Sequence, residues 1–150
     1  MGANVSVDGS SVTVTPGKLT GCEIDIDATP DLLPALAAVA AFAEGDTYFV
    51  NGARLRIKES DRLTACAQLL RDLGGAAEET ADSLIVHGTG LTGGGTHGHN
   101  DHRMVMAAAI AAVGCTEPVT IRGAEAVGKS YPGFFEDYRL LGGIISDNIE

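Results

Sequence analysis

The fold is decided by two similar stretches, DLLPALAAVAAFAEGDTYFVNGARLRIK at residues 31–58 and DHRMVMAAAIAAVGCTEPVTIRGAEAVGK at residues 101–129. Each stretch opens with an aspartate, continues as an alanine-rich helix, turns into a strand that ends in Gly-Ala, and closes with a lysine. The aspartate precedes the glycine of Gly-Ala by 21 residues in the first stretch and by 22 in the second. The sequence therefore predicts an internal repeat of about 70 residues.

The other elements follow from the spacing of apolar residues and from the positions of glycine and proline. Strands are expected at residues 5–7 and 12–15, near 24–26, at 47–50, in a second hairpin around Ala81 and Asp82, and within PVTIRGA at 118–124. Helices are expected from Pro30 to about Glu44, from about Lys58 to Leu73, from Asn100 or Asp101 to Val113, and within YPGFFEDYRLLGG at 131–143.

This order of elements predicts an α/β fold, which some schemes class as α+β. A strand-helix-strand-helix-strand-strand (βαβαββ) unit buries its helices on one side of its sheet, and two such units can share the helical layer as a common core. Asp31 with Asp101, and Lys58 with Lys129, then occupy equivalent ends of neighbouring units. We expect these four charged groups to converge on one face.

The composition limits the possible classes of function. Twenty acidic and ten basic residues give a net charge of −10, which argues against binding to nucleic acid or to an anionic membrane, because both need an excess of lysine and arginine. The longest apolar stretch, 104–113, is too short to cross a bilayer. Cys22, Cys66 and Cys115 lack CxxC spacing and are interpreted as free thiols. One globular domain in the cytoplasm is expected.

A histidine-rich stretch, GGGTHGHNDHR at residues 93–103, allows three interpretations. The first is a metal site, since His97, His99, Asp101 and His102 carry transition-metal ligands, although no second cluster has metal-like spacing. The second is a phosphate cradle, although the stretch lacks the Gly-Lys-Ser/Thr of a P-loop and no clear strand leads into it. Glycines in this stretch are expected to supply flexibility.

The third interpretation is an anion site at a helix start. Asn100 or Asp101 can cap the helix, which puts Arg103 in the first turn, where free N–H groups and the helix dipole favour anions. A cation in that turn needs a partner, either a carboxylate such as Asp101 or a bound anion. Four further cations lie within nine positions of one another: Arg54, Arg56, Lys58 and Arg62. Such a group suits an anionic ligand, and it is also typical of a solvated helix start.

The motifs RLRIKESDRL, NDHRMVMA and GKSYPGFFED, in this order, resemble the C-terminal part of the EPSP (5-enolpyruvylshikimate-3-phosphate) synthase family, and IDIDATPDLLPALAA resembles its aspartate-bearing segment. The resemblance runs from about Val5 to Gly142 and covers about the last third of the family's protein. It implies transfer of enolpyruvyl from phosphoenolpyruvate to the 5-hydroxyl of shikimate 3-phosphate, with release of phosphate and without any cofactor. It also implies domains built from three βαβαββ units, of which this chain holds about two.

Residues 1–150 are accordingly expected to form part of a C-terminal domain. A hairpin at about 1–20 ends a preceding unit, 22–88 form one unit, and 96–145 form part of a second. The resemblance also implies two kinds of partner: the N-terminal part of the same enzyme and the two substrates. By itself, the chain is expected to turn over little or no substrate.

The resemblance also implies a role for individual residues. Asp31 and Glu59 correspond to the catalytic acid/base carboxylates, and the residues leave open which of the two is the base. Asp31 and Lys58 are implied in binding shikimate 3-phosphate. The residues implied in binding phosphoenolpyruvate are Arg62, Arg103 and Lys129, with His102 as their neighbour. No metal ligand is implied, and His97 and His99 are expected to lie on a loop outside the site.

Two alternatives remain at the level of the sequence. The related transferase that acts on UDP-N-acetylglucosamine shares the fold and the enolpyruvyl donor, although KESDR together with NDHR favours the shikimate branch. A non-catalytic metal-binding module would instead use the histidine-rich stretch as its ligand set.

Overall fold

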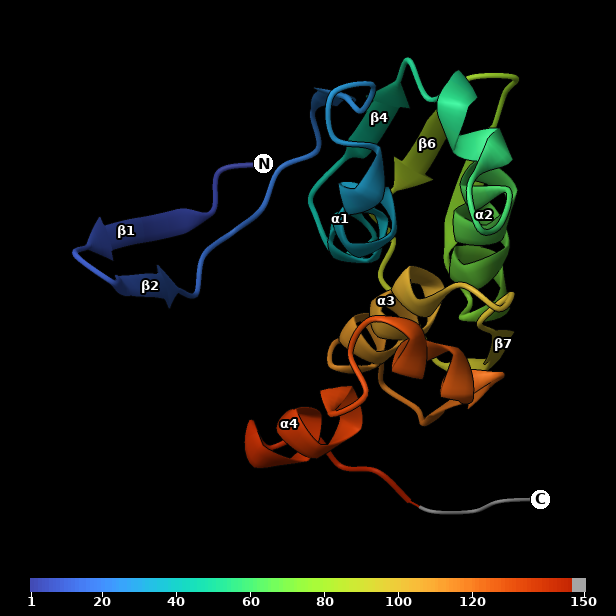
Figure 1. The fold of residues 1–150 in the computed structure, drawn as a ribbon. Helices are drawn as coiled ribbons and strands as arrows, with labels where there is room; N and C mark the ends of the chain where they lie inside the picture. The colour runs from blue at the N-terminus through green and yellow to red at the C-terminus, as the bar shows by residue number, and fades with distance from the viewer. Residues whose placement is uncertain (147–150) are drawn as a thin grey trace.

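The computed structural model describes residues 1–146, which form an N-terminal hairpin followed by two successive sets of strands and helices (Figure 1). The strands are β1 (Asn4–Asp8), β2 (Ser11–Thr15), β3 (Glu23–Asp25), β4 (Asp46–Val50), β5 (Ala76–Glu79), β6 (Leu84–His87), β7 (Gly94–His97) and β8 (Val119–Arg122). The α-helices are α1 (Leu33–Ala40), α2 (Arg62–Asp72), α3 (His102–Ala112) and α4 (Phe134–Leu140), and the 3-10 helices are η1 (Pro30–Leu32), η2 (Ala53–Ile57) and η3 (Ala124–Lys129).

The first set is a four-stranded sheet with helices packed against it. Its strand order is β3-β4-β6-β5, in which β3 and β4 run parallel and β4, β6 and β5 pair antiparallel. Helix α1 connects the parallel pair, and α2 leads from η2 into the hairpin β5–β6. This is the expected βαβαββ order.

The second set repeats the order as far as its second helix. Strands β7 and β8 run parallel and are joined by α3. The elements η3 and α4 come after β8, in the same order as η2 and α2 come after β4. The predicted α/β fold of repeated βαβαββ units, the second of them partial, is confirmed.

A shared helical layer forms the core of both sets. Helix α1 packs against α2 and α3 in the centre of the molecule (Figure 1). The buried residues of α1 and α3 are mostly alanines, whose small side chains let helix backbones approach closely. Leucines of α2 and the inward residues of β4 and β6, such as Phe49 and Val86, complete the same cluster.

Strand β7 contradicts the expectation of a flexible glycine loop before residue 100. Gly93 has φ 128°, and a Cβ there would lie 2.4 Å from the carbonyl oxygen of Glu117. The absence of a side chain therefore lets this segment run close beside the segment that leads into β8. His97 belongs to the strand, whereas His99 follows it.

Two helix boundaries also differ from those predicted. Helix α1 ends at Ala40 instead of near Glu44, because the amides of Phe42 and Ala43 bond three residues back and the carbonyl of Ala41 accepts from Gly90. Helix α2 begins at Arg62 instead of near Lys58, because Lys58 has an extended backbone and Asp61 caps the helix. Lys58 and Arg62 therefore do not share a helix face.

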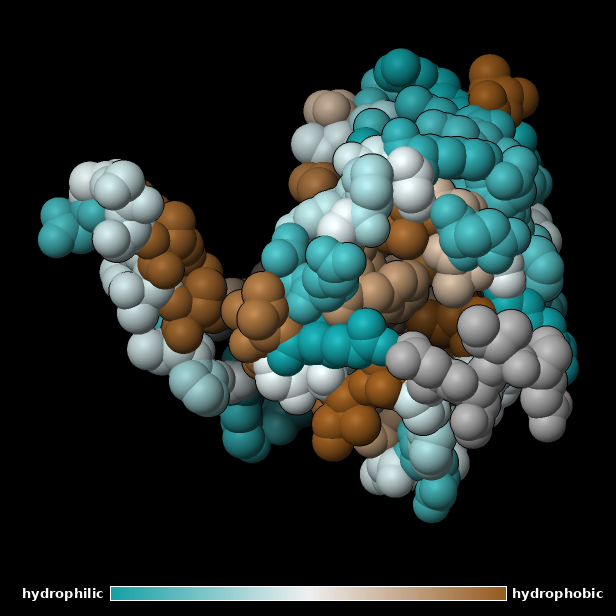
Figure 2. Space-filling model, turned by 60° about the horizontal axis from the view of Figure 1, so that its bottom comes forward, coloured by the Kyte–Doolittle hydropathy of each residue, from teal (hydrophilic) through white to brown (hydrophobic). Residues whose placement is uncertain are grey.

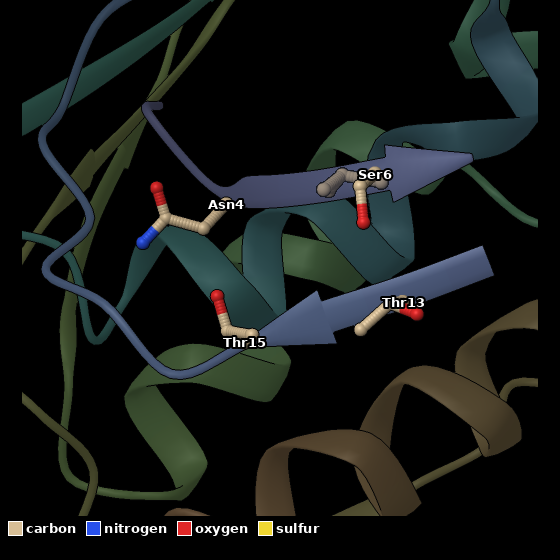
Figure 3. Close-up of a pocket in the computed structure, with 5 residues that line it drawn as sticks. Asn4, Ser6, Thr13 and Thr15 are labelled. Carbon is tan, nitrogen blue, oxygen red and sulfur yellow. The ribbon is translucent and has the colours of Figure 1, made fainter. Parts of the chain in front are cut away.

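The N-terminal hairpin β1–β2 projects from the rest of the molecule (Figure 1). All ten residues of its two strands are exposed. Figure 2 shows the hairpin standing apart from the rest of the surface, and Figure 3 shows its polar residues Asn4, Ser6, Thr13 and Thr15. Among residues 1–146, no helix is long and apolar enough to span a membrane.

Candidate active site

Arg62 lies at the centre of a cluster of charged side chains that comes from both sets of elements. It is the first residue of α2, and its side chain is fully buried. Its Nε lies 2.9 Å from Oδ2 of Asp101, its Nη1 2.7 Å from Oδ1 of Asp31, and its Nη2 2.6 Å from Oε2 of Glu59. One guanidinium thus joins three carboxylates, and a buried cation requires partners of this kind.

Asp101 is the fully buried member of the cluster. Its Oδ1 accepts the backbone amide of Arg103 at 2.9 Å and so caps α3, while Oδ2 accepts Ser60 Oγ at 3.0 Å. Burial alone would raise the pKa of Asp101, but the hydrogen bonds from Arg62 and from the Arg103 amide outweigh burial and leave the pKa below its ordinary value. Asp101 is therefore an ionised anchor between α2 and α3.

Asp31 is the carboxylate with the most cations around it. Besides Arg62, it contacts Nη2 of Arg103 at 3.0 Å and Nζ of Lys58 at 3.7 Å. The hydrogen bond from Arg62, followed by the charges of Arg103, Arg62 and Lys58, lowers the pKa of Asp31 in spite of partial desolvation. Its side chain is 46% exposed, so an ionised acceptor faces solvent at the edge of the cluster.

Lys129 lies beside the start of α3. Its Nζ is 2.6 Å from the carbonyl oxygen and 2.7 Å from Oδ1 of Asn100. Asn100 and His99 have φ values of 55° and 51°, a backbone region that non-glycine residues rarely adopt. The side chain of His97 closes the same turn, because its Nδ1 accepts the His99 amide at 2.8 Å. This strained turn therefore joins Lys129 to the residue that precedes Asp101.

Two buried polar atoms of the first turn of α3 lack hydrogen-bond partners within residues 1–146. They are Nδ1 of His102 and Nε of Arg103. Buried polar groups are normally paired, so these two atoms have a hydrogen-bonding capacity that the described residues do not satisfy.

The structure thus brings together Asp31, Lys58, Glu59, Arg62 and Arg103, with Lys129 and His102 at the start of α3. Other basic side chains are used elsewhere. Arg54 pairs with Asp27, and Arg56 bonds to Asp61 and Glu79. The suggested pairing of the Arg103 guanidinium with the neighbouring Asp101 is wrong. The guanidinium binds Asp31 instead, which lies 72 residues earlier in the sequence.

Sequence reasoning missed the central role of Asp101. It appeared as a helix cap and as an equivalent of Asp31, but its bond to Arg62 was not foreseen. The available signal was the repeat itself, which places the two aspartates at equivalent ends of α1 and α3.

The histidines form no metal centre in the part of the chain that the structure describes, where no group of three or more His, Cys, Asp or Glu side chains is placed to hold an ion. The rings of His97 and His99 are 5.3 Å apart and tilted. The metal-binding alternative therefore gains no support from this geometry.

Known proteins match this chain over nearly its whole length. The family model described as EPSP synthase (3-phosphoshikimate 1-carboxyvinyltransferase) matches residues 1–138. A 3-phosphoshikimate 1-carboxyvinyltransferase of Clostridium kluyveri is 49% identical over 98% of this chain and 35% of its own length. One from Methanocella arvoryzae is 49% identical over 95% of this chain and 34% of its own length.

A solved structure agrees with these matches. The EPSP synthase of Acinetobacter baumannii has a TM-score of 0.91 at 31% identity, covering 97% of this chain and 38% of its own. The chain spans about a third of the length of the curated relatives that it matches. By sequence and by fold, the chain belongs to the EPSP synthase family.

Proposed function

We propose that this chain supplies one wall of the active site of a 3-phosphoshikimate 1-carboxyvinyltransferase. The reaction moves the enolpyruvyl group of phosphoenolpyruvate to the 5-hydroxyl of shikimate 3-phosphate and releases phosphate. The observation that carries this proposal is the position of Asp31, a half-exposed carboxylate held by Arg62, Arg103 and Lys58.

Carboxylates are needed because protons move in both directions. The attacking hydroxyl loses a proton and the enol carbon gains one, which gives the tetrahedral intermediate. When that intermediate expels phosphate, the same carbon loses a proton again and the carbon-carbon double bond is restored. Asp31 stays ionised because its pKa is lowered by the hydrogen bond from Arg62, which suits a group that accepts the hydrogen of the hydroxyl. We assign proton transfer at the enol carbon to Glu59, and contact with shikimate 3-phosphate to Lys58 as well as Asp31.

Cations are needed because phosphoenolpyruvate carries two anionic groups and one of them leaves. Arg103 and Lys129 flank the start of α3, and we assign them to phosphoenolpyruvate together with Arg62, with His102 beside them. In the structure, Nη2 of Arg62 is bound by the partly exposed Glu59, so an anion would compete with that carboxylate.

The charge balance of the cluster supports the expectation that the chain alone is a half-site. Its carboxylates are Asp31, Glu59 and Asp101, and its cations are Lys58, Arg62, Arg103 and Lys129. One surplus positive charge is too little to hold two multiply charged substrates in water, where screening weakens each pair. The remaining cations are assigned to the N-terminal part of the same enzyme.

The experiment replaces the matching third of the Clostridium kluyveri relative by this chain and measures phosphate release with both substrates. We expect turnover by the chimera, loss of nearly all turnover in Asp31→Asn, and little change in the control Asp27→Asn, whose carboxylate pairs only with exposed Arg54 among the described contacts. The 150-residue chain alone is expected to release no phosphate. Full activity of the Asp31→Asn chimera, or turnover by the chain alone, would contradict the assignment.

A cytoplasmic location is part of the proposal. Cys22, Cys66 and Cys115 are free thiols, which a reducing compartment preserves. Fractionation of the source cells would contradict this location if the protein were recovered outside the cytoplasm.

A further inference from the structure

The turn between strand β7 and helix α3 holds two consecutive residues in an uncommon backbone conformation. His99 has φ 51° and Asn100 has φ 55°, a region that side chains other than glycine rarely adopt. Backbone strain of this kind persists only where the surrounding contacts fix it, and it gathers at functional sites. The turn leads directly into Asp101, the buried anchor of the charged cluster. The contacts that fix the turn therefore bear on the site.

His97 fixes the beginning of the turn. Its Nδ1 accepts the backbone amide of His99 at 2.8 Å, so the neutral ring carries its proton on Nε2. The first unit closes the corresponding turn in the same way, since Oδ1 of Asp25, at the end of β3, accepts the amide of Asp27 at 3.0 Å. In both units, a side chain at the end of the first strand therefore bonds the amide two residues later.

His97 also borders the segment that leads to Lys129. A Cβ at Gly123 would lie 3.3 Å from Cε1 of the His97 ring. The next residue, Gly98, donates its amide to the carbonyl oxygen of Arg122 at 2.8 Å. Gly123 directly precedes η3, whose last residue is Lys129. The turn and the segment that carries Lys129 are therefore fixed against each other.

Asn100 occupies two of the three hydrogen-bond donors of the Lys129 ammonium. Its backbone carbonyl oxygen lies 2.6 Å from Nζ, and its Oδ1 lies 2.7 Å from Nζ. Lys129 is exposed, and the head of an exposed lysine normally samples many positions on its flexible stem. The two bonds restrict the ammonium to one position and leave one N–H for another acceptor. Lys58, the equivalent lysine of the first unit, instead contacts the carboxylate of Asp31.

We propose that Asn100 and His97 are positioning residues that hold Lys129 in place for phosphoenolpyruvate. The inference rests on the proposed function, in which Lys129 binds that substrate. Asn100 supplies two neutral acceptors, which orient the ammonium without cancelling its charge, and His97 holds the backbone of Asn100 in the conformation that presents them. Because the lysine is ordered before the substrate arrives, less entropy is lost on binding.

The experiment measures steady-state kinetics of the chimera described above with the change Asn100→Gly. Glycine tolerates the positive φ and keeps the backbone carbonyl, so the change removes the Oδ1 acceptor alone. The KM for phosphoenolpyruvate should rise about three- to tenfold, the effect of one hydrogen bond. The kcat and the KM for shikimate 3-phosphate should stay within about twofold. Asn51→Gly is the matched control, because Asn51 has φ 61° and its side chain donates to Asp25, and both KM values should stay unchanged.

Replacements of His97 test the second positioning residue. His97→Ala removes the acceptor of the His99 amide and should raise the KM for phosphoenolpyruvate. His97→Asn should restore that KM, because an asparagine side chain accepts the amide two residues later, as the carboxylate of Asp25 does in the first unit. Equal KM values of His97→Ala and the unaltered chimera, or a KM of His97→Asn as high as that of His97→Ala, would overturn the role of His97.

A double-mutant cycle with Lys129→Met provides the decisive result. If Asn100 acts through Lys129, Asn100→Gly should raise the KM for phosphoenolpyruvate no further in the Lys129→Met chimera. An equal rise with and without Lys129, or no rise in Asn100→Gly alone, would overturn the inference and leave the proposed function standing. A fully active Asp31→Asn chimera would instead contradict the proposed function on which the inference rests. Nitrogen chemical shifts of the His97 ring give a test without turnover, and a neutral ring with its proton on Nδ1 would also overturn the inference.

Discussion

Nε of Arg62 lies 2.9 Å from Oδ2 of Asp101, and neither side chain is exposed to solvent. The pair joins the first residue of α2 to the cap of α3, across 39 residues of sequence. Because Arg62 also binds Asp31 and Glu59, the pair positions the carboxylates that we assign to catalysis. The stability of the fold and the geometry of the site therefore depend on the same guanidinium.

Replacing Asp101 by alanine should destabilise the chain strongly. The change leaves a buried guanidinium without its buried partner, which costs about 3–5 kcal/mol in comparable cases. Urea denaturation measures the free energy of unfolding. Asp72→Ala is the control, since Asp72 is partly exposed and its side chain accepts only from Gln68 among the described contacts. A loss as small as that of the control would refute the role of Asp101.

Acid should weaken the fold through the same cluster. The pKa of Asp101 is held below its ordinary value because the bonds from Arg62 and Arg103 outweigh burial. Its contribution to stability is present above about pH 4, the range of an unfolded aspartate, and is lost as the pH falls through the lower folded pKa. The unfolding free energy of Asp101→Asn should depend less on pH in this range than that of the unaltered chain, and equal slopes would argue against this linkage.

His87 should have the opposite pH dependence: it should stabilise the fold at low pH and lose this contribution as the pH rises. Its Nδ1 lies 2.8 Å from Asp46 and its Nε2 3.2 Å from Glu78. The hydrogen bond that His87 donates to Asp46 is the main reason that the pKa of His87 is raised. The stabilisation is complete below about pH 6.5 and is lost as the pH rises through the folded pKa. We expect this stabilisation to be about 0.2–1 kcal/mol, the size of a surface ion pair. The free energy of unfolding of His87→Gln should show no such loss between pH 6 and pH 9.

Arg56 should contribute to stability rather than to the reaction. Its guanidinium contacts Asp61, Glu79 and the carbonyl oxygens of Thr80 and Ala81, and so ties the cap of α2 to the hairpin β5–β6. Arg56→Met should lower the unfolding free energy by about 1–3 kcal/mol, the cost of losing hydrogen bonds to charged groups. Thermal unfolding should show almost no change in Arg54→Met, and equal effects of the two variants would count against this assignment.

Gly93 tests whether the glycine-rich segment is a strand or a flexible loop. A methyl group at Gly93 would meet the carbonyl oxygen of Glu117 and would need a positive φ, so Gly93→Ala should cost more than about 1 kcal/mol. Gly95 has open space at its Cβ position, and Gly95→Ala should stay within about 0.5 kcal/mol. Chemical denaturation that found the two variants equally stable would support the flexible loop.

The sequence predicted the repeated order of elements because alanine-rich helices, alternating strands and Gly-Ala turns leave local patterns. It also placed Asp31 with Asp101 at equivalent ends of two units, where the structure finds both bound to Arg62. Strand β7 could not be predicted, because a run of glycines has no apolar alternation and forms a strand through its pairing with β8.

The sequence also could not predict which charged side chains contact one another. Arg54, Arg56 and Arg62 are all arginines close to a helix start, and only tertiary structure shows that Arg62 is buried beneath three carboxylates. The start of α2 at Arg62 depends on Asp61, whose side chain accepts the backbone amide of Thr64 and so caps the helix.

We propose that charges from the two repeated units form a single anion site, and nuclear magnetic resonance can test this. Phosphoenolpyruvate, added up to millimolar concentrations to the isotopically labelled chain, should shift amide signals near Lys58–Arg62 and near Asp101–Arg103 with one common binding curve. Arg103→Gln should abolish both sets of shifts, and Arg54→Gln should keep them. Shifts confined to one of the two segments, or two unrelated binding curves, would contradict the claim.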